Sequence, residues 1–249
     1  MSKVFVGIGH GGSDPGACAY SLKESDVALD IGLEVARILR VHNVTVELSR
    51  TKDIDDDLTP KINRCNDFNP DLAVDIHCNA GNGKGFEAWV FSGGGTSLTM
   101  GENIETEVLK VGQTSRGMKT RLNDKGQDYF GFIRLVKAPS AIIETAFIDN
   151  VDDKEWLRTK ERRHILALAI AKGLLNTLGI KYQENSSEGQ EIAVKAIYKK
   201  YEDISAYAKP TIKKLIDKGV LKGDDSGDLN LTDEMIRIFV VHDRLGLYD

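Results

Sequence analysis

Cysteine is scarce in this sequence and is not spaced for metal binding. The 249 residues contain three cysteines, Cys18, Cys65 and Cys78, and no two of them form a C-x-x-C pair. The odd number of scattered cysteines argues against a disulfide framework, and the missing C-x-x-C pairs argue against a structural zinc knuckle. Free thiols are typical of a protein that is made in a reducing compartment.

Long apolar runs and an excess of basic charge are also missing. No apolar run approaches the roughly 20 residues of a membrane-spanning helix, and the N-terminal run before the glycines is shorter than the roughly 7–15 residues of a signal-peptide core. We therefore expect no membrane partner, and synthesis in the cytoplasm without a signal peptide, followed by release to the site of action. The formal net charge of −5 leaves no basic footprint for nucleic acid, which we do not expect as a partner.

Strand-like runs alternate with helical patterns through the first 180 residues. Five short apolar runs are typical of strands, at residues 3–8, 44–49, 71–77, 86–91 and 140–147. Helical periodicity covers residues 21–41, 97–114 and 158–178. This alternation predicts an α/β fold with a mostly parallel sheet flanked by helices.

The remainder of the chain has a different composition. Residues 181–190 are polar and lack periodicity, which predicts a linker. Residues 191–249 carry helical patterns without a convincing strand, so we expect a small all-helical C-terminal domain. A domain of that size is near the lower limit for independent stability. We expect an apolar face that includes Ile236, Phe239 and Val240 to be covered by the first domain or by a second copy, as in a homodimer.

The stretch GIGHGGSDPGA, residues 7–17, follows the first predicted strand. Gly7, Gly9 and Gly12 match the G-x-G-x-x-G pattern of a dinucleotide-binding loop. That loop opens directly into a helix, whereas here four turn-forming residues follow Gly12. Glycines also allow a tight bend that leaves His10 standing clear at the end of a strand. An ordinary tight turn with an exposed histidine is the other interpretation.

Ionisable residues gather where the predicted strands end. His10 follows the first strand, His77 ends the third, and Glu144 lies within the fifth. Ligands of open α/β sheets bind beyond the carboxyl ends of the strands. Either histidine alone fits a structural role as well. A carboxylate on an apolar strand is costly unless it is paired or protonated, so Glu144 is either an acid/base catalyst of raised pKa or the partner of an arginine such as Arg50.

Glu24 has two interpretations of similar weight. The sequence SLKE, residues 21–24, matches a capping box, in which the glutamate folds back onto the start of its own helix. The alternative directs the carboxylate of Glu24 toward His10. With this residue included, two histidines and one carboxylate make the three-ligand set of a catalytic zinc site, and a second carboxylate is the general base that such a site needs.

A cysteine hydrolase that uses Cys78 or Cys18 with a histidine is the rival enzyme class. In a strand, the side chains of Cys78 and His77 point to opposite faces and cannot pair. We therefore do not favour this class.

Five segments in order resemble the zinc-dependent N-acetylmuramoyl-L-alanine amidases of bacterial cell-wall turnover and phage lysis. They are GHGGSDPGA (9–17), Glu24, LSRTKD (48–53), DIHCNA (75–80) and ETAFIDNVDD (144–153), and the similarity covers about residues 1–180. The resemblance implies that His10, Glu24 and His77 bind one Zn²⁺ ion per chain and that Glu144 is the catalytic glutamate. It also implies a substrate, the amide between N-acetylmuramic acid and L-alanine in peptidoglycan.

The chain departs from the family pattern at three places. Gly7 stands where the family usually has aspartate, Lys61 where arginine is common, and Asp75 where the family has serine. No implied ligand is lost, so we expect these changes to affect the fit of the substrate and not the reaction.

Residues 215–239 resemble a single S-layer-homology repeat, which implies binding of a cell-wall polymer. We expect a phage endolysin that lyses the cell wall. A host autolysin or sporulation amidase is the alternative, and an inactive wall-binding protein is a further one.

Overall fold

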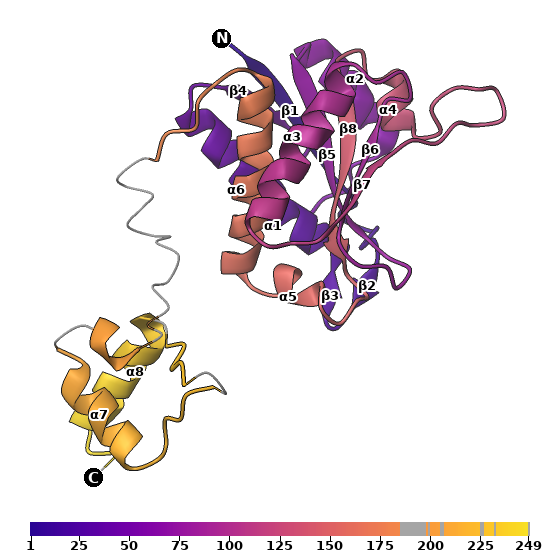
Figure 1. Ribbon diagram of the computed structural model, residues 1–249. Coiled ribbons are helices and arrows are strands. Elements are labelled where there is room, and N and C mark those ends of the chain that lie inside the picture. The colour runs from indigo at the N-terminus through magenta and orange to yellow at the C-terminus, as the bar shows by residue number, and fades with distance from the viewer. Residues whose placement is uncertain (185–197, 199, 205–206, 225–226, 232, 249) are drawn as a thin grey trace. The chain divides into compact units, whose positions relative to one another are not determined.

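The protein consists of two units, each with its own apolar core. The computed structural model describes residues 1–184, 198, 200–204, 207–224, 227–231 and 233–248. One unit spans Met1–Gln183 and the other Glu184–Asp249 (Figure 1). Most of the predicted linker, residues 185–190, lies outside the described residues, as do residues 191–197 and 199 of the expected helical domain.

The first unit is built on a sheet of six strands, which confirms the predicted α/β fold. The strands are β1 (Lys3–Ile8), β4 (Thr45–Leu48), β5 (Leu72–Asn79), β6 (Phe86–Val90), β7 (Ser115–Lys119) and β8 (Ser140–Phe147). Their order is β4-β1-β5-β8-β6-β7. All neighbours are parallel except β6 and β8. The carboxyl ends of β1, β5 and β8 therefore lie together at one edge of the sheet.

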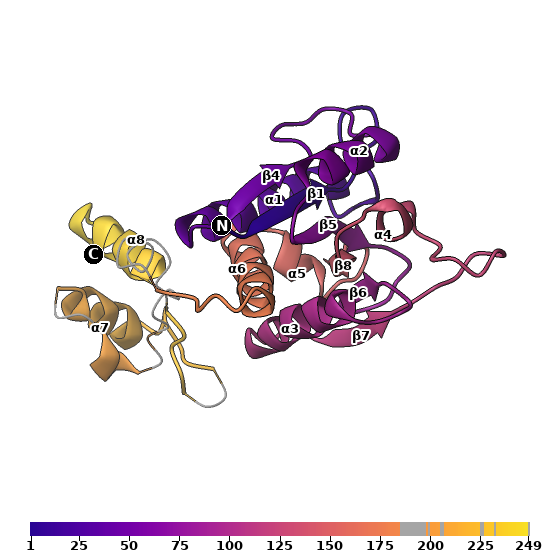
Figure 2. The same ribbon diagram turned by 90° about the horizontal axis from the view of Figure 1, so that it is seen from above.

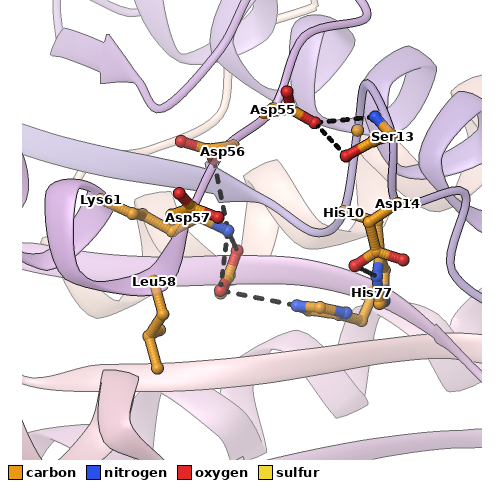
Figure 3. A pocket seen from close by; sticks show the side chains of 11 residues that line it. His10, Ser13, Asp14, Asp55, Asp56, Asp57, Leu58, Lys61 and His77 are labelled. Atoms are coloured by element: carbon orange, nitrogen blue, oxygen red, sulfur yellow. Dashed lines mark hydrogen bonds and ion pairs between the residues drawn. The ribbon is translucent and has the colours of Figure 1, made fainter.

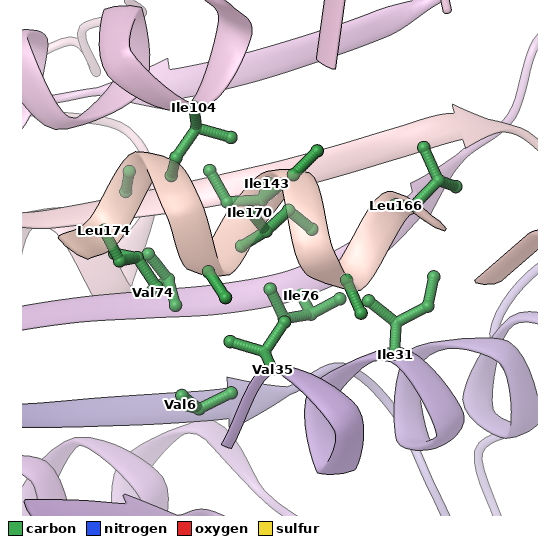
Figure 4. Close-up of a cluster of buried hydrophobic side chains, with 14 of the residues drawn as sticks. Val6, Ile31, Val35, Val74, Ile76, Ile104, Ile143, Leu166, Ile170 and Leu174 are labelled. Atoms are coloured by element: carbon green, nitrogen blue, oxygen red, sulfur yellow. The ribbon is translucent and has the colours of Figure 1, made fainter. Parts of the chain in front are cut away.

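Helices cover both faces of this sheet. The larger core lies under α1 (Glu24–Val41), α3 (Thr96–Lys110) and α6 (Lys160–Thr177). Helix α6 confirms the helical pattern predicted for residues 158–178, and its Leu166, Ile170 and Leu174 are buried against strands β5 and β8 (Figure 4). The smaller core, on the other face, lies under α2 (Leu58–Phe68) and α4 (Gly131–Leu135) (Figure 2).

Short elements lie between these helices and strands. A two-stranded hairpin, β2 (Cys18–Ala19) and β3 (Leu22–Lys23), precedes α1, so this helix begins three residues later than the periodicity predicted. The short helix α5 (Lys154–Leu157) precedes α6. None of the helices described here is long and apolar enough to cross a membrane.

The described part of the second unit is mainly helical. It contains the 3₁₀ turn η1 (Tyr201–Asp203) and the helices α7 (Lys209–Asp217) and α8 (Asp233–Arg244). Ile236 and Val240 are buried in a core within this unit, and the half-buried Phe239 packs against that core. The expectation that this face needs cover from outside was therefore wrong, because α7 and the preceding segment supply the cover.

Candidate active site

The glycine-rich loop after β1 shapes a pocket for side chains and leads into a hairpin instead of a helix. His10 itself has a left-handed backbone, with φ of 57°. A side chain at Gly9 would overlap the ring of His77, and a Cβ at Gly16 would lie 2.7 Å from Oε2 of Glu24. Because these glycines make room for the histidine and the glutamate, the interpretation as a dinucleotide-binding loop is wrong.

Glu24 is the first residue of α1, but it does not cap that helix. The residue at the N-cap is Lys23, which makes no side-chain cap hydrogen bond. Oε2 of Glu24 accepts a hydrogen bond from the backbone N–H of Ala17, and Oε1 accepts one from that of Cys78, both at 3.0 Å. The buried carboxylate is thereby held against the loop and strand β5, and the capping-box interpretation was wrong.

Three predicted residues converge on one point. Nε2 of His10 lies 3.1 Å from Oε1 of Glu24, and Nδ1 of His77 lies 3.0 Å from the same oxygen. One ligand atom from each of the three residues lies within 4.8 Å of the others. Two imidazole nitrogens and one carboxylate oxygen are the donor types that catalytic zinc takes. The residues present therefore fit a zinc ion.

The electrostatics of this cluster favour positive charge. Burial alone would raise the pKa of Glu24, but its hydrogen bonds with His10 and His77 outweigh burial and hold that pKa well below its usual range. Burial alone would lower the pKa of His77, but the charge of Asp75 and the contact with Glu24 raise it to about 10. The hydrogen bond to Glu24 likewise raises the pKa of His10. Ionised carboxylates thus surround both imidazoles and attract a cation.

Glu144 lies beside the cluster on the neighbouring strand. It pairs with His77 in the register of β5 and β8. Its Oε2 atom is shielded from solvent and has no hydrogen-bond partner among the residues described. Burial raises the pKa of this carboxyl group to about 7, and the charge of His77 only partly opposes that shift. The alternative partner, Arg50, instead donates hydrogen bonds to the backbone carbonyls of Gly9 and Ser25.

Two charged residues, Glu87 beside Glu144 and its partner Arg116, were not predicted from the sequence. Glu87 on β6 pairs with Glu144 in the antiparallel register and is buried. Its carboxylate accepts a hydrogen bond from Nδ2 of Asn79 at 2.8 Å and forms an ion pair with Arg116 of β7. The signal was available, because Glu87 is an acid within an apolar strand, as Glu144 is.

A cavity of about 430 Å³ opens beside the histidines. Acidic side chains line much of it, and it extends from His10 and His77 to the start of α2 (Figure 3). The acids that line it are Asp14, Asp55, Asp56, Asp57 and Asp75. Lys61 lines the cavity as well.

The cysteines do not fit a nucleophilic role. Cys78 is buried in the larger core, on the opposite face of β5 from His77, and burial raises the pKa of its thiol. Cys65 is also buried, and burial raises its pKa to about 12. Cys18 is exposed, and its thiol contacts the backbone carbonyl of Gly16.

Comparison with known proteins identifies the family. Residues 4–176 match the model of the Amidase_3 family, N-acetylmuramoyl-L-alanine amidase. The chain belongs to this amidase family. Its members hydrolyse the bond between N-acetylmuramic acid and L-alanine, so the predicted activity on peptidoglycan is confirmed.

Individual relatives agree with this assignment. The chain is 35% identical to N-acetylmuramoyl-L-alanine amidase CwlM of Bacillus licheniformis, over 72% of this chain and 70% of that protein. It is 32% identical to the endolysin of Bacillus phage SPP1, over 75% of this chain and 70% of the endolysin. The structure of amidase AmiC2 of Nostoc punctiforme is similar, with a TM-score of 0.66 and 28% identity over 72% of this chain and 97% of that one.

Replacing Glu24 tests whether the amidase depends on this convergence. Glu24→Ala removes the oxygen that both histidines face, so we expect the folded variant to lose bound zinc and activity. Zinc analysis of the purified protein, with circular dichroism to confirm folding, makes the measurement. Full zinc occupancy in the folded variant would contradict the role of Glu24 as a ligand.

Proposed function

We propose that His10, Glu24 and His77 hold one zinc ion per chain and that Glu144 is the catalytic glutamate of the amidase. The observation that carries this proposal is the convergence of the three donor groups beside a shielded carboxylate oxygen that has no hydrogen-bond partner among the residues described. Three protein ligands leave a coordination position open for chemistry, as in other catalytic zinc sites.

The division of labour follows from the surroundings of each group. A zinc ion held by these three residues would supply a nucleophile from water near neutral pH and would polarise the carbonyl of the scissile amide. Because the pKa of Glu144 is about 7, its carboxylate can accept and return a proton near neutrality. Glu144 takes the proton of the attacking water and passes it to the amine of L-alanine as the amide bond breaks.

Glu144→Gln separates catalysis from metal binding. The amide side chain keeps the size of the residue but cannot accept the proton. We expect zinc to remain bound while turnover falls by at least about 10²-fold, the low end for loss of a positioned acid/base group. Metal analysis and the release of free amino groups from purified cell walls measure the two quantities.

The matched control is Glu155→Gln, which neutralises an exposed acid that pairs with Arg158 on the surface. We expect this variant to behave as the parent chain does. Near-normal turnover of zinc-loaded Glu144→Gln would assign Glu144 a structural role.

We further propose that residues 1–180 form the catalytic domain and residues 191–249 an S-layer-homology-like domain that binds a cell-wall polymer, with residues 181–190 as linker. The resemblance of residues 215–239 supports this assignment. The separate apolar cores of the two units are compatible with independent roles. The buried positions of Ile236 and Val240 remove the main reason to invoke a homodimer.

Removal of the second unit tests the anchoring role. Residues 1–183 contain both cores of the first unit, so we expect this fragment to fold, bind zinc and cleave soluble muropeptides as the whole chain does. Action on intact walls and co-sedimentation with them should fall. Equal pelleting of the two forms would contradict anchoring, and a role in dimerisation would then be examined by their masses in solution.

In its biological setting, we propose that the enzyme lyses the cell wall as a phage endolysin. The similarity to the endolysin of phage SPP1 supports this role. A host autolysin of the same chemistry is the second candidate, which the similarity to amidase CwlM favours.

A further inference from the structure

Asp75 is a buried carboxylate that the proposed chemistry does not use. It lies in β5, two residues before His77, and its exposed fraction is 3%. In the parallel register it pairs with Gly7 of β1. A Cβ built at Gly7 would lie 2.5 Å from Oδ1 of Asp75. The carboxylate therefore occupies the space that any side chain at position 7 would take.

Lys61 compensates the charge of Asp75. This lysine projects from α2 and is itself buried, with an exposed fraction of 3%. Its Nζ atom lies 3.1 Å from Oδ1 of Asp75, donates a hydrogen bond to the carbonyl of Ile8 at 3.1 Å, and lies 3.4 Å from Oδ2 of Asp56 (Figure 3). Nζ thus donates hydrogen bonds to Ile8 and to both carboxylate oxygens of Asp75, and it forms an additional ion pair with Asp56. A buried ion pair needs such additional hydrogen bonds to offset its desolvation.

The other side of Asp75 faces His77. Oδ2 of Asp75 lies 3.5 Å from Nε2 of His77, while Nδ1 of the same ring faces Glu24. A Cβ built at Gly9 would lie 2.4 Å from Cε1 of this ring, so a side chain at position 9 would displace the imidazole. The imidazole is consequently held between Asp75 on one edge and the ligand cluster on the other, and Gly9 leaves the space that the ring occupies.

We propose that Asp75 is a positioning residue that orients His77 for metal binding, with Lys61 bracing its carboxylate and Gly7 leaving the space for it. Metal-ligating histidines commonly donate their second ring N–H to a carboxylate, which fixes the tautomer and the orientation of the ring. Here Nδ1 is the nitrogen left for the metal. This inference rests on the proposed zinc site.

The same contact explains the three departures from the family pattern. The expectation that they affect the fit of the substrate treated positions 7, 61 and 75 separately, whereas the structure places all three at one point behind His77. The carboxylate of Asp75 fits only because position 7 carries no side chain.

The primary test measures zinc affinity of the full chain by competition with a chromophoric chelator. The double variant Asp75→Asn/Lys61→Met removes both charges, so no lysine is left buried without its partner. We expect it to fold and to bind zinc about 10–100-fold more weakly than the parent, the loss typical of removing a carboxylate behind a ligating histidine. The visible spectrum of the cobalt-substituted protein should shift as well.

A rescue variant restores the carboxylate from the neighbouring strand β1. In Gly7→Asp/Asp75→Ser the new side chain enters the space that Asp75 vacates. We expect zinc affinity to recover to within about threefold of the parent, while Asp75→Ser alone remains weak. The control is Asp57→Asn, which neutralises an exposed acid of the same cavity, and we expect an unchanged affinity.

The outcomes separate this inference from the proposed function. If Asp75→Asn/Lys61→Met bound zinc as tightly as the parent, Asp75 would have no positioning role, although the zinc site would stand. If Asp57→Asn lost as much affinity as Asp75→Ser, the effect would be one of general charge, which also overturns the inference. A folded parent chain that bound no zinc would overturn the proposed function itself.

Discussion

The carboxylate of Glu24 is the contact on which the arrangement of the site depends. Its two oxygens accept backbone hydrogen bonds from the loop after β1 and from β5, and both histidines approach the same oxygen. A carboxylate buried without such partners would be costly. Because the buried carboxylate needs these hydrogen bonds, it connects the loop after β1, helix α1 and strand β5, which are distant in sequence.

The sheet topology makes that convergence possible. Because β1, β5 and β8 are parallel neighbours, His10 after β1 lies close to His77 of β5 and Glu144 of β8. The larger apolar core beneath α1, α3 and α6 holds these strands in register. Because the site stands on central strands and on the first turn of a packed helix, its geometry comes from a rigid scaffold.

Much of this was predictable from residue patterns, and the failures have physical causes. The five apolar strands were found because burial imposes strong patterns on them. Strand β7, with the sequence SRGMK, was missed because it is an edge strand without an apolar run. Glu144 was identified because a carboxylate on an apolar strand violates the burial pattern. The same test applied to Glu87 would have found the second buried acid.

Other features depend on tertiary contacts that no local pattern encodes. The sequence SLKE allows Glu24 either to cap its helix or to turn toward the sheet. Glu24 turns toward the sheet because its carboxylate accepts a hydrogen bond from the backbone N–H of Cys78, a residue distant in sequence. The link between Gly7 and Asp75 likewise appears only when β1 and β5 are paired. Helix α2, which carries Lys61, was not predicted, so the charge that braces Asp75 could not be placed.

Anomalous X-ray diffraction at the zinc absorption edge, from crystals of the zinc-loaded enzyme, tests the central claim most directly. The account predicts one strong anomalous peak in the first unit, within coordination distance of Nε2 of His10, Nδ1 of His77 and a carboxylate oxygen of Glu24. A peak bound by other residues, or a zinc-loaded enzyme whose peak lies away from Glu24, would contradict it.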